Sequence, residues 1–145
     1  TRLLVLEHAG ARLAVRLEEV AGVHTDRRIV PVPGMRWPLL GLVAIRGELL
    51  PAFDFGAVTG AGRAAAAPRW LAVVRGERDA RVALGFDRLE LAADVPNGAI
   101  RRREGAEEDA VVRAIVRIGE QTLPLLSLGP ATRRLAGAGD AGESR

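Results

Sequence analysis

Residues 41–55 restrict the fold more than any other stretch, because they read as two short strands joined by a tight turn. Val43 and Ile45 alternate with their neighbours, so the two-residue period of a strand puts them on one face and Arg46 on the other. Gly47-Glu48 then fits a two-residue type II′ loop, whose first position needs the positive φ that glycine adopts freely. A chain with this feature is expected to fold from β-hairpins.

The returning strand, residues 49–53, contains Pro51, which donates no hydrogen bond to a sheet and is expected at an edge or a bulge. Asp54 follows this strand and is placed to cap a short turn of helix through Val58. Before the hairpin, regular structure is interrupted by Pro31, Pro33, Gly34 and Pro38.

The pattern of the first half returns after a linker at residues 60–68, which predicts two similar β units in tandem, about 1–60 and 69–128. The aligned segments are Arg2 and Leu4 with Arg69 and Leu71 (offset 67), residues 12–15 with 81–84 (offset 69), Gly47-Glu48 with Gly119-Glu120 (offset 72), and Leu50-Pro51 with Leu123-Pro124, one residue further on. The growing offset indicates small loop insertions, and a bulge would absorb the extra residue. Chance similarity between strand-rich segments is the alternative.

Other strands are predicted where short apolar runs are bounded by turn residues. They are residues 3–6, 13–17 and 20–23 in the first unit, and 70–74, 81–86, 89–92, 111–118 and 122–126 in the second. The charged stretch 101–109 lacks apolar periodicity and is predicted to be an exposed loop. Gly129-Pro130 opens a short helix that runs through Leu135, and residues 137–145 are expected to be a disordered tail.

Composition places the chain among compact water-soluble proteins. A chain of 145 residues, 48% of them hydrophobic, can bury roughly two-thirds of the surface that its unfolded form exposes. The absence of cysteine excludes disulfides, thiolate nucleophiles and cysteine metal sites. No apolar run approaches the roughly 20 residues of a membrane span, and no signal peptide is recognisable. A cytoplasmic protein without membrane insertion is therefore expected.

The charge balance argues against a nucleic-acid partner. All 21 basic residues are arginine, but 18 acidic residues lower the formal net charge to +3, so the pI of about 11.0 overstates the positive field. Small barrels that bind single strands combine a basic groove with exposed aromatic rings. The phenylalanines, Phe53, Phe55 and Phe86, fall at apolar strand positions and are expected in the core. A nucleic-acid-binding β-barrel stays the alternative from another functional class.

No catalytic, metal or cofactor site is predicted. His8 and His24 are 16 residues apart, and neither has the clustered partners that zinc binding or general base catalysis needs. Ser127 and Ser144 lack the context of a nucleophile. The glycine-rich run 56–63 lacks the lysine followed by serine or threonine that a phosphate-binding loop requires. An enzyme is not expected.

Five residues in and around the hairpin match the pattern G-x-x-N-x-R-G-x-x-x-P-x-x-D-L, and they are Gly41, Arg46, Gly47, Pro51 and Asp54. On these residues, and along the chain from about Leu3 to Leu135, the sequence resembles the CheW-like family, the coupling proteins of bacterial chemotaxis. Ala44 and Phe55 depart from the pattern, standing where asparagine and leucine are usual.

The resemblance implies an all-β fold with short helices for residues 1–136. This fold would have two tandem SH3-like five-stranded barrels, packed side by side around a shared hydrophobic seam, and a short C-terminal helix. It also implies a non-enzymatic signalling adaptor that needs no cofactor. Its partners would be the homologous regulatory domain of a CheA-type histidine kinase, bound through barrel-to-barrel contacts, and the cytoplasmic tip of a methyl-accepting chemotaxis receptor. A groove near the junction of the barrels would accept this helical tip.

By the same resemblance, the residues expected to bind partners are Arg46, Gly47, Val20 and Val23. Arg46 matches the motif arginine, although an intramolecular salt bridge that stiffens the hairpin is the alternative role. Val20 fits a second family pattern, V-x-E-V, in which Gly22 replaces the acid. The residues expected to serve the structure are Gly41, Pro51, Asp54 and Asp87, the last in a turn or a cap. The regulatory domain of a kinase, or one unit of a multi-domain coupling protein, is the closest alternative function.

Overall fold

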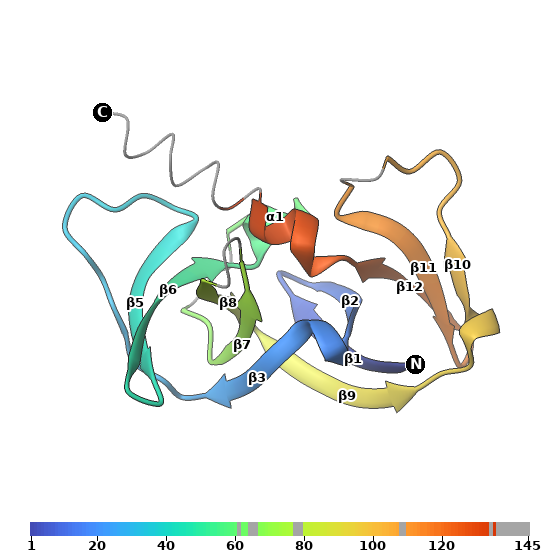
Figure 1. Ribbon diagram of the computed structural model, residues 1–145, viewed down its shortest axis with the longest axis horizontal. Coiled ribbons are helices and arrows are strands. Elements are labelled where there is room, and N and C mark those ends of the chain that lie inside the picture. The colour runs from blue at the N-terminus through green and yellow to red at the C-terminus, as the bar shows by residue number, and fades with distance from the viewer. Residues whose placement is uncertain (61, 64–66, 77–79, 108–109, 134, 136–145) are drawn as a thin grey trace.

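The structure is a computed structural model that describes residues 1–60, 62–63, 67–76, 80–107, 110–133 and 135. The fold is all-β, as predicted, and the described residues form two six-stranded sheets and two short α-helices, α1 (Gly56–Thr59) and segment 128–133. The two sheets lie side by side in Figure 1, with segment 128–133, coloured orange-red, between them at the top of the view. The predicted linker at 60–68 lies partly outside the described residues, and the predicted tail at 137–145 lies wholly outside them.

Sheet A combines strands from both ends of the chain, in the order β10-β11-β12-β2-β1-β9. Its strands are β1 (Arg2–His8), β2 (Ala11–Arg16), β9 (Arg88–Asp94), β10 (Ile100–Arg102), β11 (Val112–Ile118) and β12 (Gln121–Leu126). Neighbouring strands pair antiparallel, except β12 and β2, which are parallel. The 3-10 helix η3 (Asn97–Ala99) precedes β10. The predicted exposed loop at 101–109 is therefore wrong at its start, because Arg101 and Arg102 pair with β11.

Sheet B has the order β3-β7-β8-β6-β5-β4. Its strands are β3 (Val20–Thr25), β4 (Ile29–Val30), β5 (Leu39–Ile45), β6 (Glu48–Asp54), β7 (Trp70–Arg75) and β8 (Arg81–Phe86). The 3-10 helix η1 (Leu17–Glu19) carries the chain from sheet A to sheet B. Each sheet has six strands, whereas the resemblance implied five-stranded barrels, and one strand in each sheet is very short, since β4 and β10 have only two and three residues.

The two sheets have the same topology, and they exchange strands. If each strand of sheet A is replaced by the strand whose number differs by six, so that β10 becomes β4 and β2 becomes β8, the result is the order of sheet B read in reverse. The single parallel pair of sheet B, β6 with β8, is reproduced as well. Each sheet thus takes its first hairpin from one repeat and its other four strands from the other repeat. The predicted tandem repeat is present, but the division into units 1–60 and 69–128 does not follow the sheets, which contain strands from 2–16 with 88–126 and from 20–86.

The strand registers also correct two of the predicted repeat offsets by one residue. Leu4 of β1 pairs with Val15 of β2, and Ala72 of β7 pairs with Leu84 of β8. Leu4 therefore corresponds to Ala72, which makes the offset between β1 and β7 68 residues instead of 67. The offset of 69 between β2 and β8 is confirmed by the parallel pairs of the two sheets. The second hairpins, β5-β6 and β11-β12, correspond at 73 instead of 72, as the Leu50-Pro51 match had indicated. A shift of one residue matters because it exchanges the two faces of a strand.

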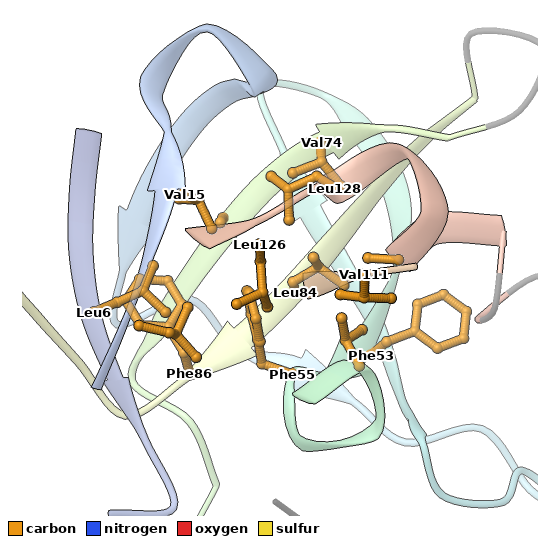
Figure 2. Close-up of a cluster of buried hydrophobic side chains, with 14 of the residues drawn as sticks. Leu6, Val15, Phe53, Phe55, Val74, Leu84, Phe86, Val111, Leu126 and Leu128 are labelled. Carbon is orange, nitrogen blue, oxygen red and sulfur yellow. The ribbon is translucent and has the colours of Figure 1, made fainter. Parts of the chain in front are cut away.

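Three clusters of buried apolar side chains hold the sheets together. One cluster lies within sheet A and includes Leu3 and Val5, and another lies within sheet B and includes Leu71 and Val73. The third, which we call the seam, joins both sheets and is shown in Figure 2. Its labelled members are Leu6, Val15, Phe53, Phe55, Val74, Leu84, Phe86, Val111, Leu126 and Leu128. Full burial of side chains of this size contributes about 1.5–3 kcal/mol each, so separating the sheets would be costly.

The position of Pro51 follows from the parallel pairing. β6 is an interior strand, but its pairing with β8 covers only Ala52 to Asp54. Pro51 lies one residue before this pairing begins, so its missing N–H costs no ladder hydrogen bond there. Pro124 lies at the equivalent place in β12, one residue before the pairing with β2. The expectation that Pro51 lies at an edge or a bulge is therefore wrong, since it lies in an interior strand at a point that β8 does not pair with.

Gly41 is needed in β5 for a steric reason. Its φ is +146°, and a Cβ at this position would lie 2.3 Å from the carbonyl oxygen of Val30. The register of β5 with β6 is irregular at this point, between Leu39 and Gly41. No other residue type fits this backbone so close to β4.

Candidate docking surfaces

Arg46 and Gly47 form the tip of the β5-β6 hairpin. Ile45 pairs with Glu48, and the two loop residues between them have φ values of +50° and +78°. Positive φ at both central positions is characteristic of a type I′ turn, so the predicted type II′ loop at Gly47-Glu48 is wrong by one residue. Glycine suits the second position of a type I′ turn as well as the first of a type II′ turn, and the glycine alone could not distinguish them. Arg46 therefore belongs to the turn and not to the strand.

The Arg46 side chain is exposed at this tip. Within the described part of the chain, its guanidinium has no ion pair, so the predicted alternative of an intramolecular salt bridge is not observed there. Glu48, the acid nearest in sequence, lies 3.7 Å from Arg81 on β8 instead. Arg46 contributes to the electrostatics of His24 on β3. Burial lowers the pKa of that imidazole, and the positive charges of Arg27 and Arg46 lower it further.

An apolar surface covers the outside of sheet B next to this tip. Cross-strand pairs bring its members together on β4, β5 and β6, and we call the surface formed by Val30, Leu42, Ala44, Leu49 and Pro51 the outer face. Leu49 is 65% exposed and Val30 is 49% exposed, although both are large apolar residues. No member carries a charge. Sequence reasoning missed this surface, although the apolar residues on both faces of β5 were a signal for it.

The same place on sheet A has a different character. Equivalent cross-strand pairs there bring together Arg101, Ile115, Arg117, Thr122 and Pro124, which we call the counterpart face. Ile115 and Pro124 keep an apolar centre, while two arginines and a threonine surround it. The repeat thus presents two related surfaces, one wholly apolar and one partly basic.

A groove of about 470 Å³ lies where the chain passes from sheet A to sheet B. It is lined by Glu18, Glu19, Val20, Ala21, Arg75, Leu128 and Gly129, from η1, the start of β3, the end of β7 and the start of segment 128–133. Val20 thus lies in a groove at the junction of the two sheets. Val23 does not line it, and packs instead against the seam. Polar and apolar side chains meet in this groove.

Glu19 is a titratable residue in the lining of this groove. Its Oε1 accepts a hydrogen bond of 3.3 Å from the backbone N–H of Leu128, whereas its buried Oε2 has no partner among the described residues. Burial raises the pKa of Glu19 above its ordinary value of 4.5, and this effect exceeds the opposing effects of the Leu128 hydrogen bond and of Arg16. The carboxylate is therefore costly to hold in its ionised form here.

Asp54 has a structural role that extends beyond the predicted cap. One oxygen, Oδ1, accepts the N–H of Gly56 at 2.9 Å at the start of α1 and lies 2.6 Å from Nε2 of the buried His8. The other, Oδ2, accepts the indole N–H of Trp37 at 2.8 Å. Asp87 lies 3.7 Å from the other ring nitrogen of His8 and accepts the N–H of Ala9 at 2.9 Å.

The two histidines are not brought together. His8 ends β1, whereas His24 lies on β3 in the other sheet. Among the described residues, no group of three histidine, aspartate or glutamate side chains is arranged to hold a metal ion. No helix in this part of the chain has the length and apolar character that crossing a membrane requires.

Comparisons with known proteins agree with the all-β fold of two related sheets. The family model of the CheW-like domain matches residues 2–134. The chain belongs to the CheW-like domain family. Its fold is similar to the crystal structure of the scaffolding protein TtCheW from Thermoanaerobacter tengcongensis, with a TM-score of 0.76, 16% sequence identity and 90% of each chain covered. A comparison with curated protein sequences finds no match.

Proposed function

We propose that this CheW-like chain is a non-enzymatic signalling adaptor that couples a chemotaxis receptor to a CheA-type histidine kinase in the cytoplasm. The observation that carries the proposal is the outer face of sheet B, where Leu49 is 65% exposed on an uncharged surface built from three strands. Contiguous exposed apolar surface of this kind is typical of protein interaction sites. Family membership indicates which partners to test.

The kinase is proposed to bind through the outer face. Its regulatory domain is homologous to this chain, so it is expected to present a surface related to the counterpart face. A contact between two different faces is heterologous, which lets the same chain join two neighbours at once. An apolar centre such as Leu49 with Pro51, surrounded by polar groups of the partner, is the usual anatomy of such an interface.

The receptor is proposed to bind in the groove that contains Val20, with Arg46 contributing from the β5-β6 tip of sheet B, to which β3 also belongs. The tip of a receptor hairpin is helical, and an amphipathic helix is bound by a groove that has an apolar wall and a polar rim. Val20 and Leu128 supply apolar wall, while Glu18 and Arg75 supply charge.

Nucleic-acid binding has less support. Phe53, Phe55 and Phe86 are buried, as predicted, and Trp70 stacks on Phe86 with its ring centroid 6.2 Å away. Trp37 alone among the aromatic residues is exposed enough to offer a ring to a base, at 37%. A single such ring does not make a stacking platform.

The proposal is tested by co-purification of the chain with the CheA-type kinase and the receptor cytoplasmic fragment of the same organism. The wild-type chain is expected to retain both partners. Arg46→Glu is expected to reduce retention of a partner while its circular-dichroism melt stays close to that of the wild type. If the wild-type chain retains neither partner, or if it binds single-stranded nucleic acid tightly in physiological salt, the proposal is wrong.

A further inference from the structure

The region around Gly22 concentrates positive charge on one side of sheet B. Arg27 lies in the short connection between β3 and β4, and Arg46 lies at the tip of the β5-β6 hairpin. β4 pairs antiparallel with β5, with Ile29 opposite Val43, so the connection before β4 lies beside the tip that follows β5. The charges of both arginines also lower the pKa of His24 on β3. Arg27 and Arg46 are exposed, and His24 is half-buried.

The acids near this region are engaged elsewhere. Asp26, next to Arg27, accepts from the Nε of Arg69 at 3.3 Å. Glu48 faces Arg81. In the described part of the chain, the guanidinium groups of Arg27 and Arg46 have no carboxylate partner. Guanidinium groups in this state have donors free for carboxylates supplied by another molecule.

Gly22 is what keeps this site open. The His24 ring extends over it, and a Cβ on residue 22 would lie 3.1 Å from His24 Nε2. A longer side chain at residue 22 would have to share this space with the ring. An acidic one would, in addition, supply a carboxylate beside His24 and the two arginines.

We propose that Arg27 and Arg46, beside the imidazole of His24, form a cationic docking site for an acidic segment of a partner protein, and that Gly22 leaves this site without an internal acid. The inference deepens the proposed function, since Arg46 is one of the residues assigned there to partner binding. It predicts that the partner segment is negatively charged, with carboxylate side chains where the segment meets the β5-β6 tip. It also makes residue 22 a determinant of which partners are accepted.

The test uses two synthetic alanine-based helical peptides about 18 residues long, a length at which such helices form in water. They are identical except that four glutamates in one are glutamines in the other. Nuclear magnetic resonance titration of the full chain is expected to shift backbone amides of residues 22–28 and 45–47 with the glutamate peptide alone. These shifts should disappear in about 0.5 M salt, where charges farther apart than a few ångströms are screened.

A matched pair of variants tests the role of Gly22. Gly22→Asp and Gly22→Asn have nearly the same shape, but only the first adds a negative charge. Gly22→Asp is expected to weaken binding of the glutamate peptide at least about fivefold relative to Gly22→Asn, a difference of about 1 kcal/mol. Arg27→Gln should weaken it as well, and Arg117→Gln, at an exposed arginine near the hairpin tip of sheet A, should not.

Equal shifts with both peptides, shifts confined to other parts of the chain, or equal binding by the two residue-22 variants would overturn the inference. These peptides contain no receptor or kinase sequence. A chain that binds the glutamate peptide as described but retains neither signalling partner would therefore contradict the proposed function and leave the cationic site standing. A chain that retains both partners but binds the two peptides equally would support the proposed function and contradict the cationic site.

Discussion

His8 and Asp54, 46 residues apart, join the two sheets through a buried contact of 2.6 Å between Nε2 and Oδ1. His8 is the last residue of β1 in sheet A, and Asp54 is the last residue of β6 in sheet B. Because Asp54 also accepts hydrogen bonds from Trp37 and Gly56, one carboxylate ties together both sheets, the loop before β5 and the start of α1.

Replacement of Asp54 should therefore be strongly destabilising. Asp54→Ala would leave His8 Nε2 buried without this partner and would remove the acceptor of two N–H groups. We expect the free energy of unfolding to fall by about 3–5 kcal/mol, because each buried polar group left without its partner costs about 1–3 kcal/mol. Urea denaturation measures this loss. Asp87→Ala is the control, since the Asp87 side chain is 38% exposed and its loss should cost only about 1 kcal/mol. Equal losses for the two variants would contradict the assigned role of Asp54.

Gly41→Ala should destabilise the chain more than an alanine at a glycine with open surroundings. The new Cβ would lie 2.3 Å from the Val30 carbonyl oxygen, so β4 or β5 would have to move. We expect a loss of about 3 kcal/mol, compared with about 1 kcal/mol for Gly10→Ala, where φ is also positive. Nothing lies within 4 Å of a Cβ at Gly10, so the larger loss at Gly41 is expected from its steric clash together with its φ of +146°, compared with +81° at Gly10. Similar losses would show that backbone strain alone explains the requirement for glycine.

Glu19 should make stability depend on pH. Burial raises its pKa in the folded state above 4.5, so the folded chain binds this proton more tightly than the unfolded chain does. The resulting stabilisation is complete below the unfolded pKa and is lost as pH rises through the folded pKa. Glu19→Gln stays neutral and keeps an acceptor for the Leu128 N–H, so its melting temperature should exceed that of the wild type at neutral pH.

The control for this experiment is Glu18→Gln, which removes the same charge from the exposed neighbour. Thermal melts between about pH 4 and pH 7 should show the advantage of Glu19→Gln growing with pH. The growth should be smaller for Glu18→Gln, because the Glu18 charge raises the pKa of Glu19 less than burial does. A constant advantage at every pH would mean that the cost of ionising Glu19 is not its source.

Leu49→Glu should disrupt kinase binding without affecting the fold. Its side chain is 65% exposed, so the free energy of unfolding should change by no more than about 0.5 kcal/mol. A charge placed at the centre of an apolar interface should weaken binding of the kinase regulatory domain at least about tenfold, or about 1.4 kcal/mol. Thr122→Glu introduces the same charge at the equivalent position of the counterpart face. Isothermal titration with both variants would distinguish the faces, and unaffected binding by Leu49→Glu would remove the outer face from the proposal.

The sequence predicted those features that depend on local pattern. β8 begins and ends at the predicted residues, 81 and 86, because an apolar run there is bounded by charged and turn residues. β4 and β10 have only two and three residues, which is too few for a period to be seen. The position of the β5-β6 loop was predicted one residue late, because Gly47 satisfies two turn types.

Long-range features of the candidate site could not be read from the sequence in this way. No local signal shows that His8 meets Asp54, or that β2 pairs with β12 of the other repeat and not with β6. The motif identified Arg46 as a residue of interest, but its exposed place beside Arg27 and His24 depends on how three strands are arranged in space. The outer face likewise appears only when the cross-strand pairs of Leu42 and Leu49 are known.

The exchange of first hairpins has a consequence for what half of this molecule can do. A fragment ending near residue 60 keeps β1 and β2 but lacks β9 and β12, the strands with which they pair, and its remaining strands lack β7 and β8. Neither half could assemble a complete six-stranded sheet in isolation, yet each would supply the strands that the other lacks. Separately expressed fragments should thus be unfolded alone and recover the native far-ultraviolet spectrum when mixed, and a lone ancestral repeat of this kind could have folded only by pairing with a second copy of itself.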